Sequence, residues 1–180
     1  MIVGIVGNRG TGKTLTMAKI GLEAIKKGKV VYSNFKFNTK KFTAEENTRL
    51  RMIDKEFFIN YKDMKLRNCI ILLDEVYVYF DSRSSATKRN RVFSYFINQT
   101  RKRGVDLYYT TQFFRQVEVR LRLNTEFFII PSLIRERKTM IVINELISFA
   151  DSMKTLGNEK FIGGDYFDIY DTDEIISFDE

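Results

Sequence analysis

The chain has 180 residues, of which 44% are hydrophobic and 14% aromatic, so it can bury the core of one domain and is too apolar to be disordered. It has no histidine and a single cysteine, Cys69. This composition excludes a disulfide scaffold, a cysteine-based zinc site, histidine–metal chemistry and the histidine-dependent catalytic triads. Any catalysis must therefore use carboxylates, amides, hydroxyls, lysine, arginine or a bound ion.

The charge is distributed unevenly along the chain. The net charge is +7, but residues 151–180 contain nine acidic residues and two lysines, whereas residues 1–150 contain 28 basic and 14 acidic residues. Ten of the basic residues lie between Arg83 and Arg122. Two interpretations stay open: a solvated basic surface balanced by an acidic tail, or a face for a polyanion that the tail screens.

Hydrophobic patterning predicts strands that alternate with helices. We expect strands at residues 2–6, 30–33, 68–73, 106–111, 125–130, 138–143 and 167–170, and helices at 14–27, 87–103 and 114–123. Residues 36–68 are polar and mixed, and Pro131 is expected to end the fifth strand. This order predicts an α/β fold with a mostly parallel sheet and helices on both faces. We expect one domain at residues 1–150, with an acidic appendage at 151–180 that packs on it or extends from it.

Two absences bear on location. No apolar run approaches the ~18 residues of a membrane span. The first seven residues have neither the basic region nor the cleavage site of a signal peptide. We therefore expect a cytoplasmic protein without a direct membrane span.

The strongest motif follows the first predicted strand. Residues 7–14 fit G-x-x-x-x-G-K-[ST] in full, with a strand before them and a helix after them. Glycines let backbone N–H groups turn toward phosphates, and the helix adds its N-terminal dipole. Lys13 would reach the β- and γ-phosphates, and the Thr14 hydroxyl would bind Mg²⁺. The predicted nucleotide-binding residues are Gly7, Asn8, Arg9, Gly10, Thr11, Gly12, Lys13 and Thr14.

A second motif ends the apolar strand at residues 68–73. Asp74 would hold Mg²⁺ directly or through water. Glu75 could act as the general base that polarises the attacking water. The alternative is a strand followed by two ordinary surface acids, and the complete phosphate loop upstream favours the first interpretation.

Other polar residues are candidates for the same reaction. Gln112 follows the fourth predicted strand and is suited to contact the γ-phosphate, because its amide can both donate and accept; a polar residue at a strand end is the alternative. Arg120 and Arg122 are candidate arginine fingers from a neighbouring subunit, and Arg9 could act within its own chain. For each arginine, a surface or DNA-contacting role is the alternative.

Together these motifs resemble the additional-strand, catalytic-glutamate branch of P-loop ATPases. Within it the chain is similar to the HerA/FtsK group, which includes viral genome-packaging ATPases, and to the Zot-like assembly ATPases of filamentous phages. The resemblance covers residues 1–131 and implies a three-layer, RecA-like core with ATP and Mg²⁺ as cofactors. It further implies a DNA motor that contacts the DNA backbone without reading sequence.

The same resemblance implies partners and a location. We expect a homo-oligomeric ring, most simply a hexamer, with capsid or portal proteins as further partners, in the host cytoplasm or associated with the virion. Zot-like proteins usually carry a membrane span after the ATPase domain. This sequence contains none, which favours packaging over extrusion.

Three alternatives remain open. One is a Zot-like virion assembly or extrusion ATPase. Another is a small nucleoside or nucleotide kinase. Residues 115–122 could imitate the lid of such a kinase, although the Asp74–Glu75 pair and Gln112 suit hydrolysis better. The third is a scaffold that binds nucleotide without hydrolysing it. A Ras-like GTPase is excluded because the guanine-reading N-K-x-D motif is absent.

Overall fold

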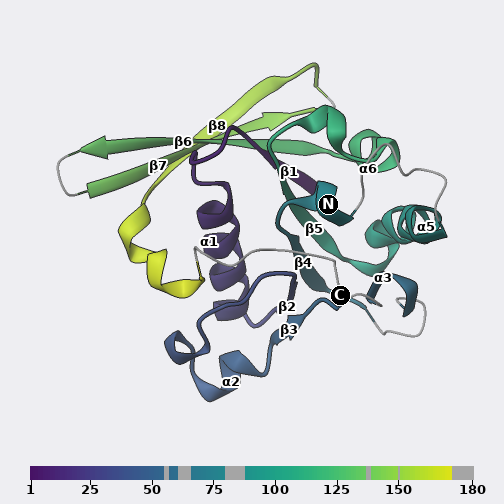
Figure 1. The fold of residues 1–180 in the computed structure, drawn as a ribbon, viewed down its shortest axis with the longest axis horizontal. Helices are drawn as coiled ribbons and strands as arrows, with labels where there is room; N and C mark the ends of the chain where they lie inside the picture. Colours follow the sequence, from purple (N-terminus) through teal and green to yellow (C-terminus); the bar gives the residue numbers. More distant parts are fainter. Residues whose placement is uncertain (55–56, 61–65, 80–87, 137–138, 150, 172–180) are drawn as a thin grey trace.

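The computed structural model describes residues 1–54, 57–60, 66–79, 88–136, 139–149 and 151–171. They form one sheet in the order β3-β2-β4-β5-β1-β6-β7-β8 (Figure 1). The strands are β1 (Ile2–Val6), β2 (Val30–Ser33), β3 (Leu50–Met52), β4 (Cys69–Leu73), β5 (Asp106–Thr111), β6 (Phe127–Glu136), β7 (Thr139–Ser148) and β8 (Lys154–Ile162).

Helices cover both faces of this sheet. They are α1 (Lys13–Lys26), α2 (Ala44–Asn47), α3 (Phe57–Asn60), α4 (Val76–Tyr79), α5 (Lys88–Arg103) and α6 (Val119–Leu123). Helix α1 lies on one side of the sheet, and α3, α5 and α6 lie on the other (Figure 1). None of these helices, as far as the chain is described, is long and apolar enough to cross a bilayer.

The alternation of side chains along β4 shows why both faces need covering. Ile70 and Leu72 belong to the buried cluster that contains Met17 of α1. Their neighbours Ile71 and Leu73 belong to the opposite cluster, with Phe93 and other residues of α5. A strand that is apolar on both sides is typical of a parallel sheet between two helical layers. The predicted fold class is confirmed.

The sheet changes direction after β6. Each neighbouring pair from β3 to β6 is parallel, whereas β6, β7 and β8 are antiparallel. We call β6–β8 the antiparallel extension. The prediction that Pro131 ends the fifth strand is wrong, because β6 continues to Glu136. The pairing of β6 with β1 stops at Ile129, so Pro131 lies where β6 has a neighbour on one side only, and a proline is tolerated there.

Other boundaries also differ from the sequence prediction. Strands β3 and β8 were not predicted, and the expected strand at 167–170 is a 3-10 helix, Phe167–Ile169, beside a single bridge between Phe37 and Tyr170. The expected helix at 114–123 is a 3-10 helix, Phe114–Gln116, followed by α6. The division of the chain at residue 150 stays a prediction, but residues 154–162 extend the sheet beyond β7.

Helix α1 is fastened to the antiparallel extension by buried polar contacts. Thr16 Oγ1 donates to Asn144 Oδ1 of β7 at 3.0 Å. Lys19 is 5% exposed and its Nζ lies 2.6 Å from Glu159 Oε1 and 2.7 Å from Glu23 Oε1. Burial alone would lower the pKa of Lys19, but the two carboxylates outweigh it and raise the pKa above its ordinary value. The ammonium therefore stays charged and ties α1 to β8.

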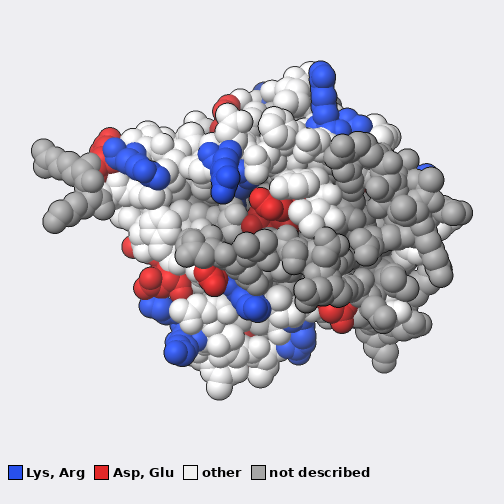
Figure 2. Space-filling view, viewed as in Figure 1, with Lys and Arg blue, Asp and Glu red and all other residues white. Residues whose placement is uncertain are grey.

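Charges are mixed on the face shown in Figure 2, where described basic and acidic side chains lie interspersed. Of the basic residues in the stretch 83–122, Arg101, Lys102, Arg115 and Arg120 are exposed. Arg83, Lys88, Arg89 and Arg91 lie outside the described side chains. The predicted polyanion face thus remains a prediction.

Helix α1 approaches the sheet closely at Gly21, which yields a stability prediction. A Cβ added at Gly21 would lie 2.6 Å from Phe37 Cζ and 2.8 Å from Leu72 Cδ1. We expect Gly21→Ala to lower the free energy of unfolding by about 1–2 kcal/mol, because overpacking outweighs the better helix propensity of alanine. Urea unfolding measures this change. Gly157→Ala is the control, since no heavy atom lies within 4 Å of its added Cβ. Equal losses of unfolding free energy in the two variants would contradict the close packing at Gly21.

Candidate functional site

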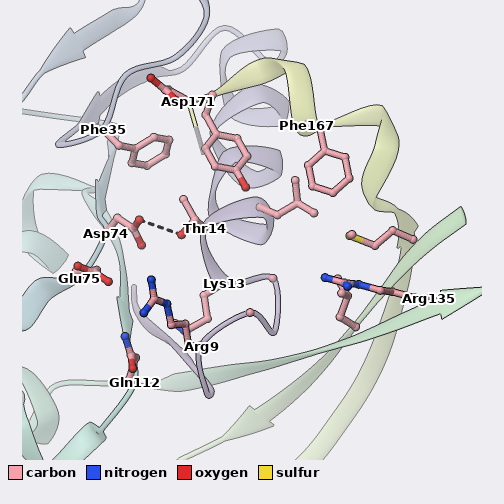
Figure 3. A pocket seen from close by; sticks show the side chains of 16 residues that line it. Arg9, Lys13, Thr14, Phe35, Asp74, Glu75, Gln112, Arg135, Phe167 and Asp171 are labelled. Carbon is pink, nitrogen blue, oxygen red and sulfur yellow. Dashed lines mark hydrogen bonds between the residues drawn. The ribbon is translucent and has the colours of Figure 1, made fainter. Parts of the chain in front are cut away.

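The predicted motifs meet at one edge of the sheet. Strands β4, β5 and β1 are parallel neighbours, so the residues after their carboxyl ends lie together, as ligand sites in such sheets do. An open pocket of about 720 Å³ lies there (Figure 3). It is lined by Arg9, Gly10, Gly12, Lys13, Thr14, Leu15, Phe35, Asp74, Glu75, Gln112, Leu133, Arg135, Met140, Phe167, Tyr170 and Asp171.

The phosphate loop connects β1 to α1 through two left-handed glycines. Gly10 has φ of 78° and Gly12, at the N-cap of α1, has φ of 95°. Glycine adopts these values without strain, so the loop can turn while the N-terminus of α1 faces the pocket. Lys13 Nζ donates to Asn8 O at 2.9 Å, on the inside of the loop. This geometry places a cation and a helix N-terminus where an anion would bind.

Burial also affects the electrostatics of Lys13. It lowers the pKa of the ammonium, while the nearby charges of Asp74 and Glu75 counteract that effect. The pKa of Lys13 stays below its ordinary value, because burial outweighs the two carboxylates.

Asp74 is the most enclosed acid of the site, with 6% of its surface exposed. Thr14 Oγ1 donates to Asp74 Oδ2 at 2.9 Å, and Thr110 Oγ1 donates to Oδ1. Burial raises the pKa of Asp74, and the two hydroxyl hydrogen bonds oppose the rise. Asn34 holds the backbone of the same residue, since its amide donates to Asp74 O and accepts from Asp74 N, both at 2.8 Å. The carboxylate is thus fixed in position.

The two residues predicted to bind Mg²⁺ fit that ion. Adjacent oxygens around an octahedral Mg²⁺ lie about 2.9 Å apart when each bond is about 2.0–2.1 Å. Thr14 Oγ1 and Asp74 Oδ2 are 2.9 Å apart. The described residues contain no group of three His, Cys, Asp or Glu that could hold a metal. Mg²⁺ in nucleotide sites usually takes its other ligands from water and phosphate oxygens.

Glu75 has an unusual backbone conformation. Its φ of 49° lies in the left-handed region that non-glycine residues rarely adopt. Its N–H donates to Thr110 Oγ1 at 2.8 Å, which helps to hold this conformation at the turn between β4 and α4. Such strain is found at functional sites, where the surrounding structure maintains it. Glu75 lies beside Asp74 on the pocket wall (Figure 3).

The remaining predicted residues divide into two groups. Gln112 and Arg9 line the pocket, on the same side as Asp74 and Glu75 (Figure 3). Arg120 and Arg122 are not among the residues that line it. Arg120 donates to Ser94 Oγ at 2.9 Å, and the guanidinium of Arg122 lies 5.9 Å from the centre of the Phe114 ring. Their role in a neighbouring subunit's site stays a prediction.

Sequence reasoning missed two sets of residues. The first supports Asp74: Asn34, which follows β2, and the side chain of Thr110. The available signal for Asn34 was a polar residue directly after a strand. Using that signal required knowing that this strand, β2, lies next to β4. The second set also lines the pocket, and its residues were given no role in the site by the sequence analysis: Phe35, Leu133, Arg135, Met140, Phe167, Tyr170 and Asp171.

Solved structures share this fold. The structure is similar to the N-terminal domain of zonular occludens toxin from Neisseria meningitidis, with 19% identity, a TM-score of 0.60, and coverage of 94% of this chain and 98% of that one. It is similar to the genome-packaging NTPase B204 from Sulfolobus turreted icosahedral virus 2 in complex with ATPγS, with 14% identity, a TM-score of 0.58, and coverage of 88% and 95%.

A third similar structure is a KaiC-like protein from Pyrococcus horikoshii, with 16% identity, a TM-score of 0.55, and coverage of 89% and 83%. At these identities the likeness establishes the fold, and it confirms the expected RecA-like P-loop core. The curated proteins contain no match to the sequence.

A family comparison covers most of the chain. The family model described as zonular occludens toxin (Zot) matches residues 1–145, a range that includes the phosphate loop, Asp74, Glu75 and Gln112. The resemblance noted from these motifs is confirmed, and the chain belongs to the Zot family.

Proposed function

We propose that the protein hydrolyses ATP and uses the energy to move DNA as part of a ring-shaped homo-oligomer. The observation that carries the proposal is one pocket that combines the phosphate loop, the Thr14–Asp74 pair, Glu75 and Gln112. Each of these groups has a distinct task in phosphoryl transfer to water, and none requires a histidine.

The proposed reaction assigns those tasks. The loop N–H groups and Lys13 bind the β- and γ-phosphates, and Gln112 contacts the γ-phosphate. Glu75 accepts a proton from the attacking water as the water oxygen bonds to the γ-phosphorus. The bond to the β–γ bridging oxygen breaks, and ADP leaves. Mg²⁺, held by Thr14 and Asp74, would neutralise charge on the phosphates.

Further parts of the site come from outside this chain. An arginine of a neighbouring subunit, Arg120 or Arg122, would stabilise the charge of the transition state. Both side chains lie away from their own chain's pocket, which is compatible with such a role. A hexamer is the expected ring.

Two observations support DNA as the moved polymer. Residues 1–150 carry twice as many basic as acidic residues, a balance that suits sequence-independent contact with a phosphate backbone. The fold is also that of B204, which is described as a genome-packaging NTPase. Capsid or portal proteins would be further partners, in the host cytoplasm or at the virion.

A second candidate is a virion assembly or extrusion ATPase. Membership of the Zot family favours it, and the same pocket and reaction would serve it. The two candidates differ in what the motor acts on and share the ATPase cycle.

Glu75 provides the sharpest test of the hydrolysis mechanism. We expect Glu75→Gln to bind ATP as tightly as the wild type but to hydrolyse it at least about 100-fold more slowly, because it loses the general base. Calorimetric ATP binding and steady-state phosphate release measure the two properties. The matched control is Glu136→Gln, an exposed glutamate outside the pocket. Wild-type turnover in Glu75→Gln would refute the base assignment, and normal binding and turnover in Lys13→Ala would refute the whole site.

DNA dependence tests the coupling. We expect ATP turnover to rise when DNA is added, and the rise to shrink as salt increases, since backbone contacts release counterions. Phosphate release with and without DNA, at two salt concentrations, measures this, together with the particle mass with and without ATP analogue. Transfer of phosphate to nucleosides would instead indicate a kinase, and nucleotide binding without turnover would indicate a scaffold.

A further inference from the structure

The pocket extends well beyond the residues that the proposed reaction uses. Asp74, Glu75 and Gln112 lie on one side of Lys13, whereas Arg135 and Phe167 lie on the other (Figure 3). Leu133 and Met140 also line the pocket. They belong to β6 and β7, as Arg135 belongs to β6. The pocket therefore has a reacting end and a second end, which the antiparallel extension and Phe167 build.

The position of the phosphate loop determines which part of a bound nucleotide lies at the second end. With the γ-phosphate beside Gln112 and Glu75, the rest of a nucleoside triphosphate has to run away from those residues along the N-terminus of α1. The pocket volume of about 720 Å³ lies within the range of sites that enclose a whole small molecule. The sugar and the base would thus lie toward Leu133, Met140 and Phe167.

The chemistry of the second end suits a flat, aromatic group. Leu133, Met140 and Phe167 are apolar and only partly exposed. An aromatic ring and a thioether are good contacts for the face of a base. The Arg135 guanidinium points into the pocket at the same end (Figure 3), where it can meet phosphate or ribose oxygens.

Phe167 is held in place by the residues around it. We call residues 163–171 the C-terminal wall. Asn38 N donates to Ile169 O at 2.6 Å, and Asn38 Nδ2 donates to Asp168 O at 3.0 Å. Lys41 Nζ lies 2.9 Å from Asp168 Oδ2, and Ile169 is buried. The wall is therefore fixed before a ligand arrives, which reduces the entropic cost of binding.

The other end of the wall packs against the phosphate-loop helix. A Cβ added at Gly163 would lie 3.1 Å from Leu15 Cδ2 and 3.4 Å from Met140 Cγ. The wall thus touches both α1 and β7. The Zot family match ends at residue 145, so the wall lies outside the segment that the family model describes.

We propose that Leu133, Met140 and Phe167 form the subsite for the base of the bound nucleotide, with Phe167 stacking on the base. This inference rests on the proposed function, because it requires a nucleoside triphosphate in the pocket. It assigns a task to the C-terminal wall: to supply affinity for the nucleoside that the phosphate loop alone cannot provide.

The test compares ATP with inorganic tripolyphosphate, which has the phosphates without the nucleoside. Calorimetric titrations with Mg²⁺ use the full chain, as wild type, Phe167→Ala, Phe167→Trp and the control Phe149→Ala, whose partly exposed ring packs on Phe114 and Phe128. We expect Phe167→Ala to weaken ATP binding by about 5- to 150-fold, the usual worth of one stacked base. Tripolyphosphate binding should be unchanged, and Phe167→Trp should keep ATP affinity near that of the wild type.

Each contrary outcome has a distinct meaning. If the wild type binds ATP and Phe167→Ala binds it equally well, the base subsite is wrong and the proposed function stands. An equal loss of ATP and tripolyphosphate affinity in Phe167→Ala, or the same loss in Phe149→Ala, also overturns the subsite, since the effect would then not concern the base. If the wild type binds neither ligand, the proposed function itself fails, and the subsite with it.

Discussion

The buried carboxylate of Asp74 is the interaction on which the site depends. Removing an acid from water is costly unless donors replace the lost hydration, and here Thr14 and Thr110 each donate to one of its oxygens. Asn34 holds the backbone on either side of the same residue. One residue therefore connects α1 and β5 with the segment that follows β2. These contacts hold the phosphate loop and the reacting end of the pocket in fixed positions relative to each other.

This arrangement requires the observed strand order. Strand β4 lies between β2 and β5, and β1 lies beyond β5, so residues far apart in the chain emerge at one edge of the sheet. Thr110 supports both acids with one hydroxyl, which donates to Asp74 and also accepts from the backbone N–H of Glu75. The left-handed conformation of Glu75 is thereby held, and the acid next to the proposed Mg²⁺ ligand is turned to the pocket.

The antiparallel extension completes the environment of α1. In a two-sided sheet, the outer surface of such a helix would be exposed to solvent, but here β7 and β8 pack against it and bury Thr16 and Lys19 with polar partners. The antiparallel extension also lines the pocket, with Leu133 and Arg135 of β6 and Met140 of β7. Packing that secures the phosphate-loop helix thus also builds the second end of the site, which couples the fold of the extension to nucleotide binding.

The sequence alone predicted the sheet with its two helical layers, the loop at residues 7–14, and the placement of Asp74, Glu75 and Gln112. These features are local: a strand, its last residues and the following turn lie within a few positions of one another. Strand β8, the passage of β6 through Pro131, Asn34 as a support for Asp74, and the C-terminal wall were not predicted. Each depends on which strands become neighbours or on side chains that meet across long stretches of chain, 40 residues for Asn34 and Asp74 and 128 for Thr16 and Asn144. The residues of the reacting end could therefore be predicted from local sequence motifs. The enclosure of the pocket was decided by tertiary packing, because no local pattern shows which distant residues will come into contact.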